Sequence, residues 1–255
     1  MQSQPQDATA LPLTGERTVP GVPHENYWFR RHEAAYEFLL PYATDATATV
    51  LDVGCGEGYG AARFAGAAGR VVGVDYDAGT VAHAATRYRT ARFVRGNLAA
   101  LPVRSASVDV LATLQVIEHV WDHAQFVGEC RRVLRPGGRL LVTTPNRLTF
   151  SPGRDTPDNP FHTHEFTAAE LRELLSRAGF VDLDVRGLHA GPRLQTLDRK
   201  HGGSFTDAQL AAPPAQWSAT LTQDVVGVVR ADFVVSAADP ESALDLVVVA
   251  RRPGV

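Results

Sequence analysis

A glycine-rich segment constrains the fold of this 255-residue chain more than any other feature. The segment Asp52–Gly58 (DVGCGEG) follows the β-branched run Thr49–Val53 and precedes an alanine-rich stretch, which predicts a strand, a tight turn and a helix. Glycines let the backbone approach a ligand closely, and a helix N-terminus offers free N–H groups and a positive dipole end. Gly54, Gly56 and Gly58 are therefore candidate ligand-binding residues. In open α/β sheets, ligands bind beyond the carboxyl ends of the strands, where this segment is expected to lie.

The rest of the chain predicts strands that alternate with helices. This order is typical of an α/β fold with parallel crossovers and a doubly wound sheet, here with seven strands. The segment Pro136–Gly138 predicts a turn before the fifth strand, and Thr167 with Glu170 predicts a helix-capping box. The predicted strands are Thr49–Val53, Arg70–Asp75, Ala91–Arg95, Val108–Leu114, Arg139–Thr144, Phe180–Val185 and Ala243–Ala250. The predicted helices are Glu25–Tyr42, Gly58–Ala68, Ala78–Tyr88, Ala124–Leu134 and Thr167–Ala178.

The pattern predicts one domain over residues 14–255 after a disordered polar tail, residues 1–13. Between about residues 188 and 231, Gly, Pro, Asp and His are frequent and only short helices are expected. An irregular stretch of this length in a compact domain is more often a functional cover than a connector. We therefore expect a C-terminal lid insertion there.

Composition limits the possible partners and location. The chain has 25 Lys and Arg against 28 Asp and Glu, and this balance argues against a nucleic-acid binder. Two cysteines far apart, Cys55 and Cys130, indicate a reducing compartment. No segment matches a signal peptide or a run of about 20 apolar residues. We expect a cytoplasmic protein without stable membrane association.

Two kinds of nucleotide-like ligand compete for the glycine segment. A dinucleotide fingerprint needs G-x-G-x-x-G, but Tyr59 stands where the third glycine would be. Asp52, directly before the glycines, suits a positively charged ligand better than a pyrophosphate. Asp75 ends the second predicted strand, where an acidic residue can accept hydrogen bonds from a ribose diol.

Five motifs in this order resemble those of class I S-adenosylmethionine (SAM)-dependent methyltransferases. They are Asp52–Gly58, Asp75–Asp77, Gly96–Leu98, Leu114–Val120 and Arg132–Gly138. The resemblance implies a Rossmann-like methyltransferase fold and SAM as the methyl donor. It implies that the helix before the first strand covers the cofactor and that Arg31 pairs with the methionine carboxylate. The implied SAM-binding residues are Arg31, Asp52, Gly54, Gly56, Gly58, Asp75, Tyr76, Asn97, Leu98 and Leu114.

The residues after the fourth strand and the fifth strand are candidates for chemistry on the methyl acceptor. An alcohol needs a base, a metal, or both to lose its proton at neutral pH. Gln115, Glu118 and His119 have helical spacing and could hold Mg²⁺, and His119 is also a candidate catalytic residue. His162 is the preferred base candidate. His119, His162 and Asp158 form an alternative metal set, and the sequence does not separate base from ligand.

Longer segments resemble the actinobacterial 1-O-methyltransferases of methylmannose polysaccharide biosynthesis. They include Glu25–His32, Thr149–Pro157, Asn159–His162 and Gly191–Leu194. The resemblance implies Mg²⁺-assisted methylation of the anomeric hydroxyl of a short 3-O-methylated mannoside. The loops supply aromatic and polar residues that suit a sugar: Tyr27, Trp28, Phe150, Phe161, Arg154, Asp155 and Asn159, with Arg193 as a further acceptor contact.

Three other functions remain open at this point. They are an O-methyltransferase of a phenolic or quinone precursor, a SAM-binding protein without transfer activity, and a nicotinamide-dependent oxidoreductase. Partners expected from the resemblance are a small oligosaccharide acceptor and a second copy of the chain in a homodimer.

Overall fold

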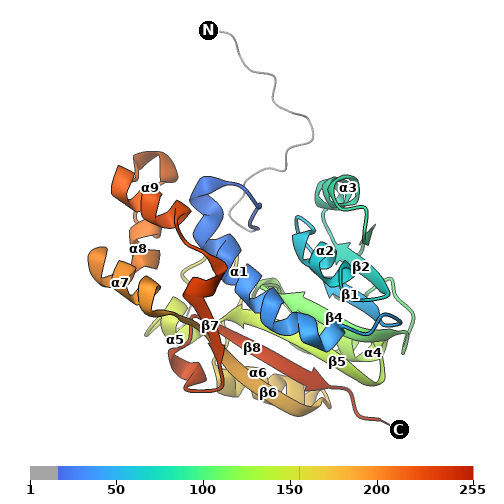
Figure 1. Cartoon of the computed structure of the whole chain (residues 1–255). Coiled ribbons are helices and arrows are strands. Elements are labelled where there is room, and N and C mark those ends of the chain that lie inside the picture. Colours follow the sequence, from blue (N-terminus) through green and yellow to red (C-terminus); the bar gives the residue numbers. More distant parts are fainter. Residues whose placement is uncertain (1–16, 155, 255) are drawn as a thin grey trace.

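The computed structural model describes residues 17–154 and 156–254, and in this part of the chain one sheet has eight strands (Figure 1). The predicted tail, residues 1–13, lies outside the described residues. The strands are β1 (Thr49–Val53), β2 (Arg70–Asp75), β3 (Arg92–Arg95), β4 (Val108–Leu114), β5 (Leu134–Pro145), β6 (Val181–Ala190), β7 (Phe233–Ser236) and β8 (Asp245–Arg251). The helices are α1 (Asn26–Leu39), α2 (Tyr59–Ala65), α3 (Ala78–Arg87), α4 (His123–Val133), α5 (Arg147–Phe150), α6 (Ala168–Arg177), α7 (Pro192–Lys200), α8 (Phe205–Leu210) and α9 (Ala219–Val226).

The strand order is β3-β2-β1-β4-β5-β8-β6-β7. The first five pair in parallel, while β8 pairs antiparallel with both β5 and β6, and β7 pairs antiparallel with β6. The Rossmann-like α/β fold is confirmed, but the prediction of seven strands was wrong by one. The additional strand, β7, has only four residues and lies just after the irregular stretch, so no periodic run marked it.

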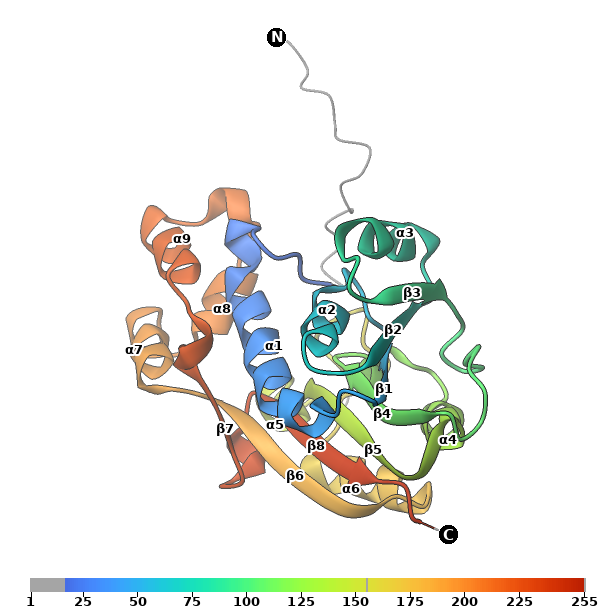
Figure 2. The same ribbon diagram turned by 45° about the vertical axis from the view of Figure 1, so that its right-hand side comes forward.

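Two hydrophobic cores lie on opposite faces of the sheet, as alternation along β1 requires. Val50 packs in the core that includes Tyr36 of α1 and Phe64 of α2. Leu51 packs in the core that includes Phe126 of α4 and residues of α6. Figures 1 and 2 show α1 and α2 on one side of the sheet and α4 and α6 on the other.

The predicted turn at Pro136–Gly138 was wrong, because this segment lies inside β5. Val108 of β4 pairs with Leu134 and Val110 pairs with Arg139, so the extra residues on β5 form a bulge. Gly137 supplies the positive φ of +80° in this bulge. The expected capping box is confirmed: Thr167 Oγ1 accepts from Glu170 N, and Glu170 Oε2 accepts from Thr167 N.

Helices α7, α8 and α9 form the segment between β6 and β7 and lie beside α1 (Figure 2). We call this segment, residues 191–229, the lid. Asn26 of α1 attaches it, because Asn26 Nδ2 donates to Val225 O at 3.0 Å and to Val228 O at 2.9 Å at the end of α9. Across the described ranges, no helix is long and apolar enough to cross a membrane.

Candidate functional site

The glycine loop runs from β1 into α2, and β2 holds its backbone. Gly54 N and Cys55 N donate to Val74 O at 2.7 and 3.0 Å. Gly54 has φ +74°, and a Cβ there would lie 2.4 Å from a methyl group of Val116. At Gly58, with φ +100°, a Cβ would lie 2.8 Å from Ala84 Cβ. The tight turn therefore requires glycine at both positions.

Two buried carboxylates lie next to this loop. Asp75 Oδ2 accepts from Gly56 N, and Asp75 Oδ1 accepts from Asp77 N, both at 3.0 Å. Asp52 is 1% exposed, and among the described residues its Oδ2 has no hydrogen-bond partner. Burial, and secondarily the negative charge of Asp75, raise the pKa of Asp52 to about 7. This negative region suits a positively charged ligand.

The other predicted cofactor residues lie at the carboxyl ends of adjacent parallel strands. Tyr76 follows β2 and is 67% exposed, whereas Leu114 ends β4 and is buried. Asn97 follows β3, where its Oδ1 accepts from Ala99 N, and Leu98 packs partly against a core. The fold thus brings these residues to one edge of the sheet, and their contacts with SAM stay predictions.

Arg31 has a partner that the sequence did not indicate. Its Nε and Nη2 donate to both carboxylate oxygens of Asp245, at 2.7 and 2.5 Å, and Nη2 also donates to Leu244 O. Both side chains are nearly fully buried. Arg31 joins α1 to β8 in this way, and its predicted contact with the methionine carboxylate stays a prediction.

Glu118, His119 and His162 meet beyond β4. One potential ligand atom from each lies within 4.8 Å of the others. Glu118 and His119 belong to a 3₁₀ turn, Ile117–His119, and His162 comes from the loop after α5. Thr163 fastens the two segments together, because its backbone N donates to Glu118 O at 2.7 Å. We call these three residues the triad.

Each side chain of the triad has one polar atom that is held by a neighbouring residue. Thr144 Oγ1 donates to Glu118 Oε2 at 3.0 Å, His119 Nδ1 lies 2.9 Å from Phe161 O, and His162 Nδ1 lies 2.8 Å from Glu165 Oε1. Metal-binding histidines usually donate their other ring N–H to a carbonyl or carboxylate in this manner. Burial raises the pKa of Glu118 to about 8, so a bound cation would displace its proton. The donor set and its outer partners fit a divalent cation.

Two other predicted ligands, Gln115 and Asp158, line the same cleft as the triad. Gln115 directly follows β4 in a left-handed conformation, with φ +57°, which is rare for a residue other than glycine. Its side-chain Nε2 donates to Thr143 Oγ1 at 3.2 Å. Asp158 pairs instead with Arg154, 2.6 Å away. The alternative metal set combined Asp158 with His119 and His162. In the structure the carboxylate beside these two histidines is that of Glu118.

The triad lines a large cleft of about 1170 Å³. Residues of α1, the loop after β5 and the lid form its walls, including Trp28, Phe150, Phe161, Asn159, Asp198 and Asp207. Trp28 and Phe150 pack edge to face with ring centroids 6.4 Å apart. Tyr27 lines the cleft too, but it is only 3% exposed and packs against Phe205.

Two residues that were predicted to contact the acceptor, Arg193 and Asp155, are not shown to line this cleft. Arg193 pairs with Asp232 at 2.6 Å and donates to Gly227 O, so its side chain joins α7 to the segment that follows α9. It is not among the described residues that line the cleft. Asp155 lies outside the described residues.

Sequence reasoning missed three residues of the site. Glu165 contacts His162, and the spacing His162-x-x-Glu165 was a signal for it. Glu57 is buried in the glycine loop and accepts from His83 at 3.0 Å and Tyr88 at 2.6 Å of the α3 region. Arg17 lines the cleft and packs near Gly56, which makes it a second candidate cation for the methionine carboxylate.

Comparison with known proteins shows the family to which the chain belongs. Residues 51–142 match the family model "Methyltransferase domain". The chain is 56% identical over 250 residues to a probable SAM-dependent methyltransferase of Mycolicibacterium smegmatis, covering 96% of each chain. It is 52% identical to a protein of the same description from Mycobacterium tuberculosis, covering 98% of this chain and 94% of that one. In fold, it is similar to a possible histamine N-methyltransferase of Thermotoga maritima, with a TM-score of 0.60, 19% identity and coverage of 88% and 92%. The chain therefore belongs to the class I SAM-dependent methyltransferases, enzymes with a Rossmann-like fold that use SAM as the methyl donor.

Proposed function

We propose that this enzyme methylates a hydroxyl of a small carbohydrate with the help of a divalent cation, Mg²⁺. The preferred acceptor is the anomeric hydroxyl of a short 3-O-methylated mannoside. The observation that carries the proposal is the position of the triad in a cleft of about 1170 Å³ with mixed aromatic and polar walls. The sequence resemblance to the mannoside 1-O-methyltransferases supplies the acceptor.

The lining of the cleft supports a carbohydrate acceptor. Trp28, Phe150 and Phe161 offer aromatic faces, while Asn159, Asp198 and Asp207 offer hydrogen-bonding groups. Sugar rings with methyl ethers present both C–H surfaces and hydroxyls, so they need both kinds of contact. Clefts of this size usually bury most of a small ligand.

The chain's residues have distinct roles in this mechanism. Glu118 and His119 would hold the cation, with Gln115 as a further ligand. A bound divalent cation lowers the pKa of a coordinated hydroxyl. His162 Nε2 would accept the hydroxyl proton, and the glycine loop with Asp52 would hold SAM for an in-line transfer of its methyl group.

The test is methyl transfer from labelled SAM by the full chain in the presence of Mg²⁺. The acceptors are 3-O-methylated mannobiose, unmethylated mannobiose and catechol, and the product is located by mass spectrometry and NMR. We expect transfer to O1 of the methylated sugar and much less to the two controls. Transfer to catechol alone would favour a phenolic acceptor. SAM binding without transfer to either sugar would contradict the proposal.

A further inference from the structure

A buried carboxylate, Glu165, lies against the Nδ1 atom of His162. Glu165 comes just before α6, and its Oε1 lies 2.8 Å from His162 Nδ1. The exposed fractions of the two side chains are 0% for Glu165 and 5% for His162. The contact is therefore a short hydrogen bond shielded from water.

The neighbours of His162 fix which ring nitrogen carries the proton. Asn159 Oδ1 accepts from Phe161 N at 3.0 Å, which turns Asn159 Nδ2 toward His162 Nε2, 3.1 Å away. An amide nitrogen only donates, so Nε2 must accept and carries no proton. The ring proton is then on Nδ1, where it is donated to Glu165. A base or a metal ligand that acts through Nε2 needs this tautomer.

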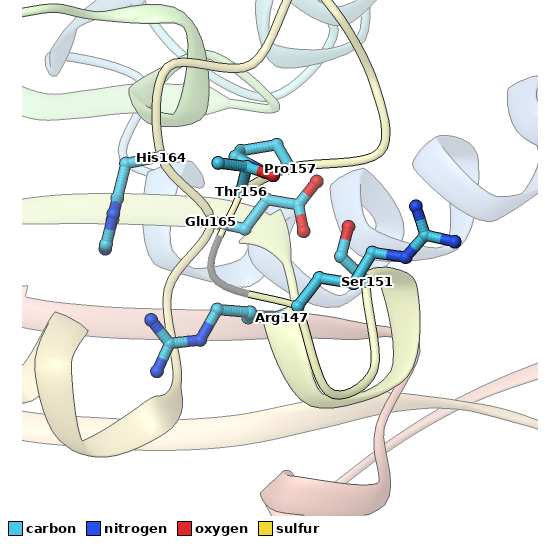
Figure 3. A pocket seen from close by; sticks show the side chains of 7 residues that line it. Arg147, Ser151, Thr156, Pro157, His164 and Glu165 are labelled. Atoms are coloured by element: carbon cyan, nitrogen blue, oxygen red, sulfur yellow. The ribbon is translucent and has the colours of Figure 1, made fainter.

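Folding alone does not account for a carboxylate at position 165. Glu165 Oε2 is buried and has no hydrogen-bond partner within residues 17–154 and 156–254. Figure 3 shows the Glu165 side chain between Pro157 and Ser151, beside a cavity of about 10 Å³, which has room for about one water molecule.

The nearby positive charges have other partners. Arg147 pairs with Glu170 at 2.9 Å, and Arg154 pairs with Asp158 at 2.6 Å. A buried carboxylate without an Arg or Lys partner destabilises a fold relative to a neutral residue of the same shape. Its presence directly behind a residue of the triad therefore points to a role in the site.

We propose that Glu165 is the positioning residue of His162. It holds the Nδ1–H tautomer and the orientation of the ring, so that Nε2 is the accepting atom, to which Asn159 Nδ2 donates until an acceptor hydroxyl takes its place. Glu165 does not touch the acceptor or SAM in this role. The effect on catalysis rests on the proposed function, whereas the tautomer itself does not.

The first measurement reads the tautomer without any acceptor. The full chain is labelled with ¹⁵N-histidine and bound to S-adenosylhomocysteine, and the spectrum of His162→Gln assigns the ring signals of His162. We expect the Nδ1–H form in the wild type and in Glu165→Gln, which keeps an acceptor oxygen. We expect a mixture of tautomers in Glu165→Leu. An Nε2–H form in the wild type would overturn the proposal.

The second measurement compares kinetics with stability. We expect kcat to fall about 10- to 100-fold in Glu165→Leu and less in Glu165→Gln, as is usual when the outer partner of a site histidine is removed. The KM values and the melting temperature should change little. The control is Glu173→Gln, an exposed carboxylate of α6 that pairs with Arg177.

The outcomes separate the positioning role from the proposed function. A wild-type kcat in Glu165→Leu, or a loss of activity that follows a loss of melting temperature, would overturn the positioning role. If the wild type methylates none of the sugars, the proposed function fails. The ring signals of His162 would still decide the role of Glu165 in that case.

Discussion

At the scale of single residues, Asp52 shows how burial changes the protonation of a carboxyl group. Its carboxyl group is buried next to Asp75, and its pKa is raised to about 7. A raised pKa means that Asp52 favours the folded state when protonated. This stabilisation is present below its unfolded pKa and is lost as the pH rises through about 7. The sulfonium and ammonium groups of SAM would reverse this preference, because they favour the ionised carboxylate.

We therefore expect SAM binding to depend on pH through Asp52. Affinity should increase by at most about tenfold per unit as the pH rises toward 7, and level off above it. Asp52→Asn should bind SAM more weakly and remove most of this dependence. Isothermal titration between pH 5.5 and 8.5 measures both, and buffers of different ionisation enthalpy report the released proton. An equal pH dependence in the variant would assign the effect to another group.

At the scale of elements, the buried ion pair between Arg31 and Asp245 joins α1 to the beginning of β8. The two side chains are 3% and 1% exposed. Trp28, which lines the cleft, lies under the Arg31 guanidinium at 5.4 Å. The ion pair thus sets the position of a cleft wall relative to the sheet.

Breaking this ion pair should destabilise the folded protein. In Asp245→Ala the guanidinium of Arg31 is left buried without its partner, and we expect the free energy of unfolding to fall by about 3–5 kcal/mol. The matched control is Arg251→Ala at the other end of β8, where an exposed pair with Asp182 contributes about 0–1 kcal/mol. Urea unfolding followed by circular dichroism compares the two. Equal losses in the two variants would show that burial adds nothing to the pair.

At the scale of the whole molecule, the parallel half of the sheet could be predicted and the antiparallel half only in part. Val108–Leu114 was predicted with the bounds that β4 has, because a mostly apolar run ends there at the motif that follows. β8 lies between β5 and β6, and no local pattern encodes this place or its antiparallel direction. Pro136 and Gly137 have the composition of a turn, yet pairing of β5 with β4 and β8 extends the strand through them.

The candidate site could likewise be predicted only in part from the sequence. Glu118 and His119 directly follow a predicted strand, so their place at its carboxyl edge could be predicted. His162 could be named but not placed, because its loop is positioned by contacts such as Thr163 with Glu118, 45 residues away in sequence. The resemblance assigned Arg31 to the methionine carboxylate, and no local pattern indicated its partner Asp245, more than two hundred residues away. Long-range partners of buried charges are what the sequence of one chain does not reveal.

In the proposed mechanism, the triad supports methyl transfer through a bound divalent cation. The most direct test is the rate of transfer to 3-O-methylated mannobiose by enzyme stripped with EDTA, then titrated with Mg²⁺, in the wild type and in Glu118→Gln. We predict no turnover after stripping, full recovery with Mg²⁺ in the wild type, and at least about a tenfold loss in the variant at saturating Mg²⁺. Full turnover in the presence of EDTA, or an unchanged response in Glu118→Gln, would contradict the claim.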